Sequence, residues 1–201
     1  MHSIARITAF VAALAVSLPA LAAASVGQAA PNFSAIDTSG KAVSLADFKG
    51  RTVVLEWVNP GCPFVQKHYN SGNMQSLQKK YGNDVVWLAV NSTHTGASDY
   101  QSPEKLSALM KGFNAAPADY LMDANGAVGR AYGAKTTPHM YIIDKDGRLL
   151  YNGAIDDKRS TNVEDVKTSK NYVSAALDEM KAGKPVSVAS TSPYGCTVKY
   201  R

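Results

Sequence analysis

The stretch "TVVLEWVNPGCPFVQKHY", Thr52 to Tyr69, decides the fold. Its first seven residues form a nearly continuous apolar run of strand length, which predicts a central strand covered on both faces. Pro63 favours the first turn of a helix, because its fixed φ and missing N–H suit that position. The stretch therefore predicts a buried strand that runs into a helix, with Cys62 at the junction.

Two residues of this stretch indicate redox chemistry. A thiol attacks as its thiolate, and the free N–H groups of a helix N-terminus stabilise that charge, so we expect Cys62 to be an exposed, reactive nucleophile. Glu56 lies in an otherwise apolar strand, where burial raises the pKa of a carboxyl group and suits it to relay protons. The alternatives are a buried structural cysteine at position 62 and an ion pair between Glu56 and a lysine.

The rest of the chain alternates short apolar strands with amphipathic helices. The strand "DVVWLAVN", residues 84–91, follows the first helix and completes a βαβ unit. Residues 32–45 predict an N-terminal hairpin, and Asp146-Gly147 is a strong signal for a second hairpin. This order predicts an α/β fold with a central mixed sheet and helices on both faces. The aromatic residues assigned to its core are Trp57, Trp87, Tyr141 and Tyr151.

The first 24 residues have the composition of a cleaved secretory signal peptide. Arg6 precedes an apolar run, and small residues at A-x-A spacing follow Pro19. We therefore expect an exported protein, periplasmic in a bacterium, with one domain over residues 26–187 and a C-terminal tail over residues 188–201. An uncleaved N-terminal anchor is the alternative.

Composition limits the classes of function. The chain has 201 residues, of which 45% are hydrophobic, and a formal net charge of +5 that is scattered along the sequence. This charge is too small and too dispersed for a nucleic-acid surface, and no later segment reaches the length of a membrane span. No cofactor is expected, and no metal, since His68 and Cys62 lie on different helix faces. An even number of cysteines in an exported chain, Cys62 and Cys196, favours pairing.

Thr137-Pro138, ahead of the strand "MYIID", is the third unusual feature. Proline is disfavoured on entering a central strand, because it cannot donate a ladder hydrogen bond. A cis peptide bond that ends a loop would accommodate it. We therefore expect a special backbone geometry at Pro138.

Together, the helix-start cysteine, the acidic residue six positions earlier and the Thr-Pro pair resemble the thioredoxin fold over residues 26–200. The motifs "NPGCPFV", "GAKTTPHMYIIDKDG", "GAIDD" and "PYGC" followed by "V-KY" are similar to those of the exported, peroxiredoxin-like branch of the redoxin (AhpC/TSA) family. The chain departs from the C-x-x-C motif at Val65. It also lacks the peroxiredoxin Thr or Ser, replaced by Asn59, and the peroxide-binding Arg, replaced by Pro138.

The resemblance implies a thiol:disulfide oxidoreductase. Cys62 would attack a protein or small-molecule disulfide, or a hydroperoxide, and Cys196 would resolve the product. Glu56 would relay protons, and an upstream thiol reductant would recycle the pair. A static disulfide and an unrelated free thiol remain alternatives for Cys196. The expected substrate contacts are Pro60, Gly61, Pro63, Thr137 and Pro138.

Two other functions remain open at this point. The first is a thiol-dependent peroxidase, although the missing Thr and Arg argue against it. The second is a module without catalysis that binds copper or a partner protein, although a copper site needs a second nearby thiol. The sequence leaves the oligomeric state open.

Overall fold

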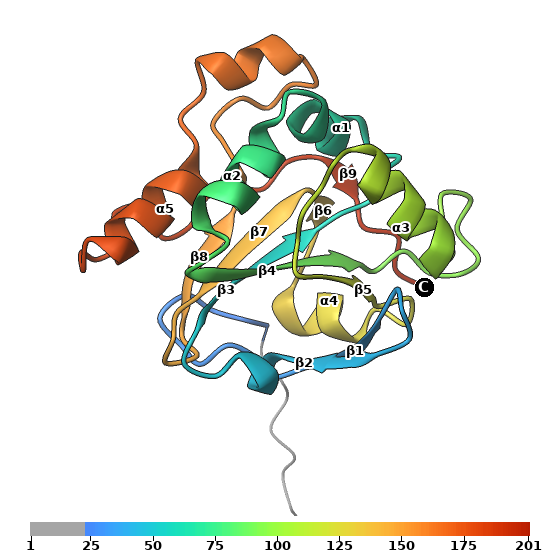
Figure 1. The fold of residues 1–201 in the computed structure, drawn as a ribbon, viewed down its shortest axis with the longest axis horizontal. Coiled ribbons are helices and arrows are strands. Elements are labelled where there is room, and N and C mark those ends of the chain that lie inside the picture. The colour runs from blue at the N-terminus through green and yellow to red at the C-terminus, as the bar shows by residue number, and fades with distance from the viewer. Residues whose placement is uncertain (1–22) are drawn as a thin grey trace, which may run out of the picture.

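The computed structural model describes residues 23–201, so most of the predicted signal peptide, residues 1–22, lies outside the described residues. Its main sheet has seven strands in the order β2-β1-β5-β4-β3-β7-β8 (Figure 1). β3 pairs in parallel with β4 and antiparallel with β7, so the mixed sheet expected from the sequence is confirmed. The strands are β1 (Ser34–Asp37), β2 (Ala42–Ser44), β3 (Thr52–Trp57), β4 (Val85–Asn91), β5 (Asp119–Met122), β7 (His139–Ile143) and β8 (Leu149–Gly153).

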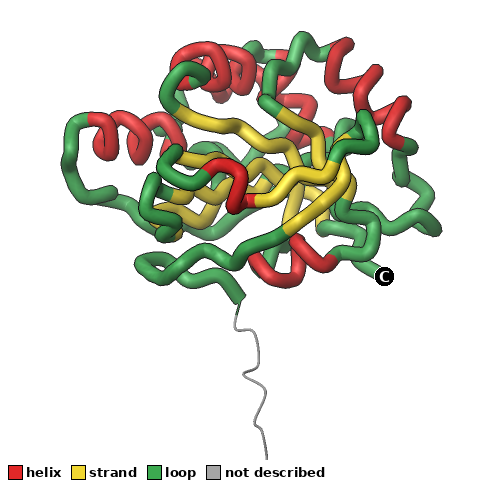
Figure 2. Tube along the Cα trace, turned by 60° about the horizontal axis from the view of Figure 1, so that its bottom comes forward, coloured by secondary structure: helices red, strands yellow, loops and turns green. Residues whose placement is uncertain are grey.

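Helices cover both faces of this sheet, as Figure 1 shows and the rotated view of Figure 2 repeats. One face carries four α-helices, whereas the short α4 lies on the other with the 3-10 turn η1. The helical elements are α1 (Pro63–Asn70), α2 (Asn73–Tyr81), α3 (Pro103–Gly112), α4 (Ala127–Tyr132), α5 (Tyr172–Lys181), η1 (Leu45–Phe48) and η2 (Val163–Lys167). Within residues 23–201, no helix combines the length and apolar character that a membrane crossing requires.

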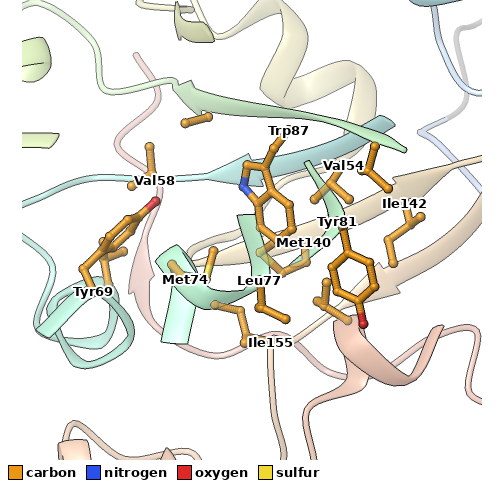
Figure 3. Close-up of a cluster of buried hydrophobic side chains, with 14 of the residues drawn as sticks. Val54, Val58, Tyr69, Met74, Leu77, Tyr81, Trp87, Met140, Ile142 and Ile155 are labelled. Carbon is orange, nitrogen blue, oxygen red and sulfur yellow. The ribbon is translucent and has the colours of Figure 1, made fainter. Parts of the chain in front are cut away.

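The strand β3 is central because its side chains serve both layers. Val54 belongs to the cluster under the four helices, whereas Leu55 and Trp57 belong to the cluster under α4. Figure 3 shows the first cluster, in which residues of α2 such as Leu77 pack against Trp87 of β4. All four aromatic residues assigned to the core are buried.

A break separates α1 from α2. α1 ends at Asn70, and α2 begins at Asn73 after Gly72, whose φ of 74° lies in the left-handed region that favours glycine. α1 begins next to the end of β3. The break then redirects the chain, and α2 packs over the sheet.

The C-terminal tail returns across the molecule after α5. Ser190 forms a parallel bridge with Asn152, which places the tail along the outer edge of β8. Further on, β9 (Cys196–Thr197) pairs antiparallel with β6 (Thr136–Thr137) in a separate two-stranded sheet. In Figure 1 this red segment runs beneath the start of α1. The tail is thus packed along its length.

Candidate active site

Cys62 occupies the predicted junction between strand and helix. It is the N-cap residue of α1, with φ −79° and ψ 123°, and its carbonyl accepts a hydrogen bond of 2.9 Å from the Gln66 N–H. Its own N–H donates to the Asn59 carbonyl at 3.0 Å, which closes the turn after β3. The sulfur therefore lies at the positive end of the helix dipole.

The thiol of Cys62 is nevertheless buried. The residue is 3% exposed, and its Sγ donates a hydrogen bond to the Thr137 carbonyl at 2.9 Å. The expectation of an exposed thiol is therefore wrong for this conformation. The loop at Thr137 and the tail cover the start of α1, a long-range arrangement that the local sequence around Cys62 does not encode.

Cys196 lies next to Cys62, although the two are 134 positions apart in the sequence. In β9 it sits opposite Thr137, the residue whose carbonyl binds the Cys62 thiol. Both cysteines are free and line one cavity. Burial raises the pKa of Cys196 to about 12, and its contact with Cys62 adds to the rise. The two sulfurs can therefore bond to each other once Cys62 carries a mixed disulfide or a sulfenic acid and Cys196 has lost its proton.

Glu56 is fully buried in β3, six residues before Cys62. Its carboxylate accepts hydrogen bonds from the Tyr69 hydroxyl at 2.9 Å and the Trp87 ring N–H at 2.8 Å. Figure 3 shows these two polar atoms facing one another. Burial raises the pKa of Glu56 to about 7, although both hydrogen bonds lower it. The raised pKa expected from the sequence is confirmed. None of the ion pairs in residues 23–201 includes Glu56, so the alternative of an ion pair with a lysine is wrong.

The five residues expected to contact substrate separate into two groups. Gly61 and Thr137 line the cavity between the cysteines. Pro60 is buried and accepts a hydrogen bond from Gln66, Pro63 is exposed at the first position of α1, and Pro138 is buried behind Thr137. The Thr137–Pro138 peptide bond is cis, the geometry considered for it from the sequence. These three prolines shape the backbone around the cavity without lining it.

Asn59 and Asp99 also line the cavity and were not among the expected site residues. The Asn59 side chain accepts from the Gly61 N–H at 2.9 Å and donates to Asp99 Oδ2 at 3.2 Å. The other oxygen of Asp99 is buried and has no hydrogen-bond partner among residues 23–201. Asn59 could have been found from the sequence, because it replaces the Thr or Ser of peroxiredoxins. Asp99, in a loop 40 residues away, gave no such signal.

A second polar group holds the tail against the back of α1. Lys67 of α1 forms a fully buried ion pair with Asp156, at 3.3 Å. The Tyr194 hydroxyl donates to the same carboxylate and lies 3.2 Å from His68 Nε2. We call Lys67, His68, Asp156 and Tyr194 the anchor cluster. It joins the motifs "GAIDD" and "PYGC", so Tyr194 fixes the tail two residues before Cys196.

None of the histidines in residues 23–201 lines the cavity. Burial lowers the pKa of His68 and of His139 to about 4, so both rings are neutral at pH 7. His139 Nε2 contacts the Asn152 side chain at 2.7 Å. Across residues 23–201, no three His, Cys, Asp or Glu side chains gather as a metal site would require.

Comparison with known proteins finds a thiol-disulfide oxidoreductase among the relatives of this chain. The chain is 29% identical over 128 residues to the thiol-disulfide oxidoreductase ResA of Bacillus thuringiensis, covering 62% of this chain and 67% of ResA. An uncharacterized conserved protein of Geobacillus kaustophilus has a similar crystal structure, with TM-score 0.76, 29% identity and coverage of 88% of this chain and 93% of that one.

The thioredoxin domain of a thiol-disulfide oxidoreductase from Bacteroides vulgatus shares the fold, with TM-score 0.52, 19% identity and coverage of 72% of this chain and 96% of that domain. The thioredoxin-like fold expected from the sequence is therefore confirmed, as is the expectation of an oxidoreductase. Residues 25–170 match the Redoxin family, which is most of the described chain. With the strand–helix cysteine and the cis-proline loop in place, the chain belongs to the redoxin family.

Proposed function

We propose that this protein is an exported thiol:disulfide oxidoreductase in which Cys62 is the nucleophile and Cys196 the resolving thiol. The observation that carries the proposal is the shared cavity of two free cysteines that are 134 positions apart in the sequence. Export rests on the leader expected in residues 1–24, which would place the protein in the periplasm of a bacterium. Disulfides persist in that compartment.

In the first step, the Cys62 thiolate attacks one sulfur of a disulfide. A new S–S bond joins Cys62 to that sulfur, the original S–S bond breaks, and the other half leaves as a thiolate. The position of Cys62 at the N-terminus of α1 stabilises the negative charge on its sulfur. The hydrogen bond to the Thr137 carbonyl holds the neutral thiol and is given up when the proton leaves.

Glu56 supports this step as a proton-relay residue. With a pKa of about 7, its carboxyl group takes up and releases a proton near neutral pH. It lies on the face of β3 that α1 covers, since its partner Tyr69 belongs to α1. Among residues 23–201 no hydrogen bond joins Glu56 to Cys62 directly, so the proposed relay is indirect.

In the second step, Cys196 attacks the sulfur of Cys62, and the bound half of the substrate leaves as a thiolate. The pKa of about 12 keeps Cys196 protonated at neutral pH, so this step needs a base. Asp99 lines the same cavity and has one oxygen free to accept that proton. An upstream thiol reductant then returns the Cys62–Cys196 disulfide to two thiols.

Trapping the thiols at the moment of cell lysis tests the proposal. Periplasmic extract is alkylated before and after reduction, and the mass of the protein is measured. We expect one Cys62–Cys196 disulfide in a fraction of the molecules, and a mixed disulfide on Cys62 in a Cys196→Ser variant. Two free thiols under oxidising conditions, with no adduct in the variant, would contradict the proposal.

The reduction potential of the wild-type protein separates a cycling disulfide from a static one. Equilibration of the purified protein in glutathione buffers of graded potential measures its reduction potential. A cycling pair exchanges in this range, whereas a static structural disulfide stays oxidised throughout.

A further inference from the structure

The tail forms a strap over the active site, anchored at several points. The strap is the segment 189–200, which begins at the edge of β8, where the Thr191 N–H donates to the Asn152 carbonyl at 3.1 Å. It ends beyond β9, where the Tyr200 hydroxyl donates to the Ala134 carbonyl at 2.9 Å. Between these points Val198 N–H donates to the Lys135 carbonyl at 3.0 Å. A segment held in this way does not open by moving one end.

The anchor cluster adds the strongest attachment. Tyr194 is 4% exposed, and its hydroxyl contacts both members of the buried Lys67–Asp156 ion pair. Lifting Tyr194 would leave buried charged groups with fewer partners, which is costly in a low-dielectric interior. The strap is therefore held in place immediately before Cys196.

Gly195 brings the strap into direct backbone contact with the loop at Thr137. A Cβ atom at this position would lie 2.1 Å from the Thr137 carbonyl oxygen and 2.7 Å from its carbon. The φ of 141° is also one that residues with side chains rarely adopt. Only glycine allows this approach, so β9 occupies the backbone edge of β6 and no other strand can pair there.

The space that remains at Cys62 is small. The cavity between the cysteines has a volume of about 50 Å³, whereas sites for drug-sized ligands have about 300–1,000 Å³. A water molecule takes up about 30 Å³ in the liquid. The cavity therefore admits a molecule of a few heavy atoms, but not an extended polypeptide around a disulfide.

We infer that the strap restricts Cys62 to small oxidants, in which a reactive O–O or S–S bond is carried by a molecule of few atoms, and excludes polypeptide disulfides. This inference rests on the proposed function and names its substrate class. A polypeptide would react only through a state with the strap open. An open state populated at about 1% slows such a reaction about 100-fold.

Both small oxidants give balanced reactions at this site. A small disulfide reacts by the two exchanges described above and releases two thiols. With a hydroperoxide, the Cys62 thiolate attacks the terminal oxygen, the O–O bond breaks, and the alcohol or water leaves with a proton. Cys196 then attacks the sulfenic acid sulfur of Cys62, an S–S bond forms, and the sulfenic oxygen leaves as water.

Rates of Cys62 oxidation in the reduced full-length protein test the inference. The oxidants are hydrogen peroxide, dimethyl disulfide and an unfolded disulfide-linked dimer of ten-residue peptides. Each rate is divided by the rate of the same oxidant with a free peptide of the sequence of residues 59–66. We expect at least one small oxidant to exceed the peptide dimer by at least about tenfold on this scale. The faster of the two small oxidants identifies whether the O–O or the S–S bond is the preferred one.

A glycine pair supplies matched variants. Gly195→Ala pushes β9 away from Thr137, so we expect the relative rate of the peptide dimer to rise by at least about tenfold. Gly183→Ala is the control. Gly183 also has a positive φ, 68°, but a methyl group added there meets nothing within 4 Å. The oxidation rates of this variant should therefore match those of the wild type. Circular dichroism and thermal melts show whether each variant folds. If Gly195→Ala does not fold, the comparison of the three oxidants on the wild-type protein still tests the inference.

The outcomes separate the inference from the proposed function. If the peptide dimer oxidises the wild-type protein as fast as the small oxidants, the inference is wrong and the oxidoreductase proposal stands. If no oxidant modifies Cys62 faster than it modifies the free peptide, the proposed function itself is wrong.

Discussion

Glu56 makes the stability of the protein depend on pH. Burial raises the pKa of Glu56 from its ordinary value of 4.5 to about 7 in the folded protein. Between pH 4.5 and about pH 7 the folded state therefore binds more protons than the unfolded state. The stabilising contribution is full below about pH 4.5 and is lost as pH rises through about 7. Its size is on the order of 3 kcal/mol. Urea unfolding at pH 5 and pH 9 should show this loss, and Glu56→Gln should reduce it.

The matched control is Glu164→Gln, because Glu164 is exposed in a surface ion pair with Lys167. This change should leave the difference between pH 5 and pH 9 as it is in the wild type. An unchanged difference in Glu56→Gln would mean that Glu56 titrates normally.

Asp99 should govern the second step of the reaction. Replacing it by asparagine removes the base that lines the cavity while keeping the side-chain shape. Positioned bases typically contribute about 100-fold or more, so Asp99→Asn should slow closure of the Cys62–Cys196 disulfide by at least about tenfold. The decay of a preformed mixed disulfide on Cys62, followed by mass spectrometry, measures this step.

Asp84→Asn provides the comparison for Asp99→Asn, since Asp84 pairs with Lys181 on the exposed surface. It should close the disulfide at the wild-type rate. Equal rates in all three proteins would remove Asp99 from the mechanism.

Single residues were predictable where they contradict their surroundings. Glu56 in an apolar strand and Cys62 beside a helix-starting proline stand out in the sequence, and the structure places both in the expected elements. Asp99 lies in a polar loop, where an aspartate is unremarkable in composition. Its role depends on a contact with Asn59, 40 positions earlier, which local sequence does not reveal.

At the scale of elements, α1 and the tail depend on the anchor cluster. Lys67→Met leaves the buried Asp156 carboxylate without its cation, a loss that costs about 3 kcal/mol or more in comparable buried pairs. Lys80→Met breaks a pair with Asp178 whose side chains are both 52% exposed, and should cost less than about 1 kcal/mol. Urea unfolding of the two variants at pH 7 compares these costs. Similar losses of stability would show that the anchor cluster adds nothing beyond a surface pair.

The sequence predicts the longer elements better than the shortest ones. β3, α1 and the break at Gly72 follow from strong local signals, namely an apolar run, Pro63 and a glycine. β9 has only two residues, and no periodicity can appear in so short a strand. It exists because its partner β6 and the anchor cluster hold it.

At the scale of the molecule, the Cys62–Cys196 bond would close a long loop. In the chain-entropy view, a loop of this length stabilises the fold by about 5 kcal/mol. The oxidised protein should therefore unfold at a higher urea concentration than the reduced protein. Cys196→Ser should unfold at the same concentration under both conditions, and a wild type that did the same would show that the bond does not form or is strained.

The topology was predictable as a whole, but the coverage of the active site was not. Alternating strands and helices predicted the mixed sheet, because the hydrophobic pattern of each segment indicates its own type of secondary structure. The burial of Cys62 arises from segments that are 75 and 134 positions away, Thr137 and Cys196. Such contacts depend on the complete fold. An exposed thiol was therefore the natural expectation, and it was wrong.

The contact between Ser190 and β8 has a consequence for the protein in solution. β8 is the last strand of the sheet, and without residues 189–191 its outer row of backbone amides and carbonyls would be open to water. Open strand edges of this kind pair with other chains and lead to aggregation. A protease that clipped the chain after α5 would thus remove the resolving thiol and also create a molecule prone to self-association.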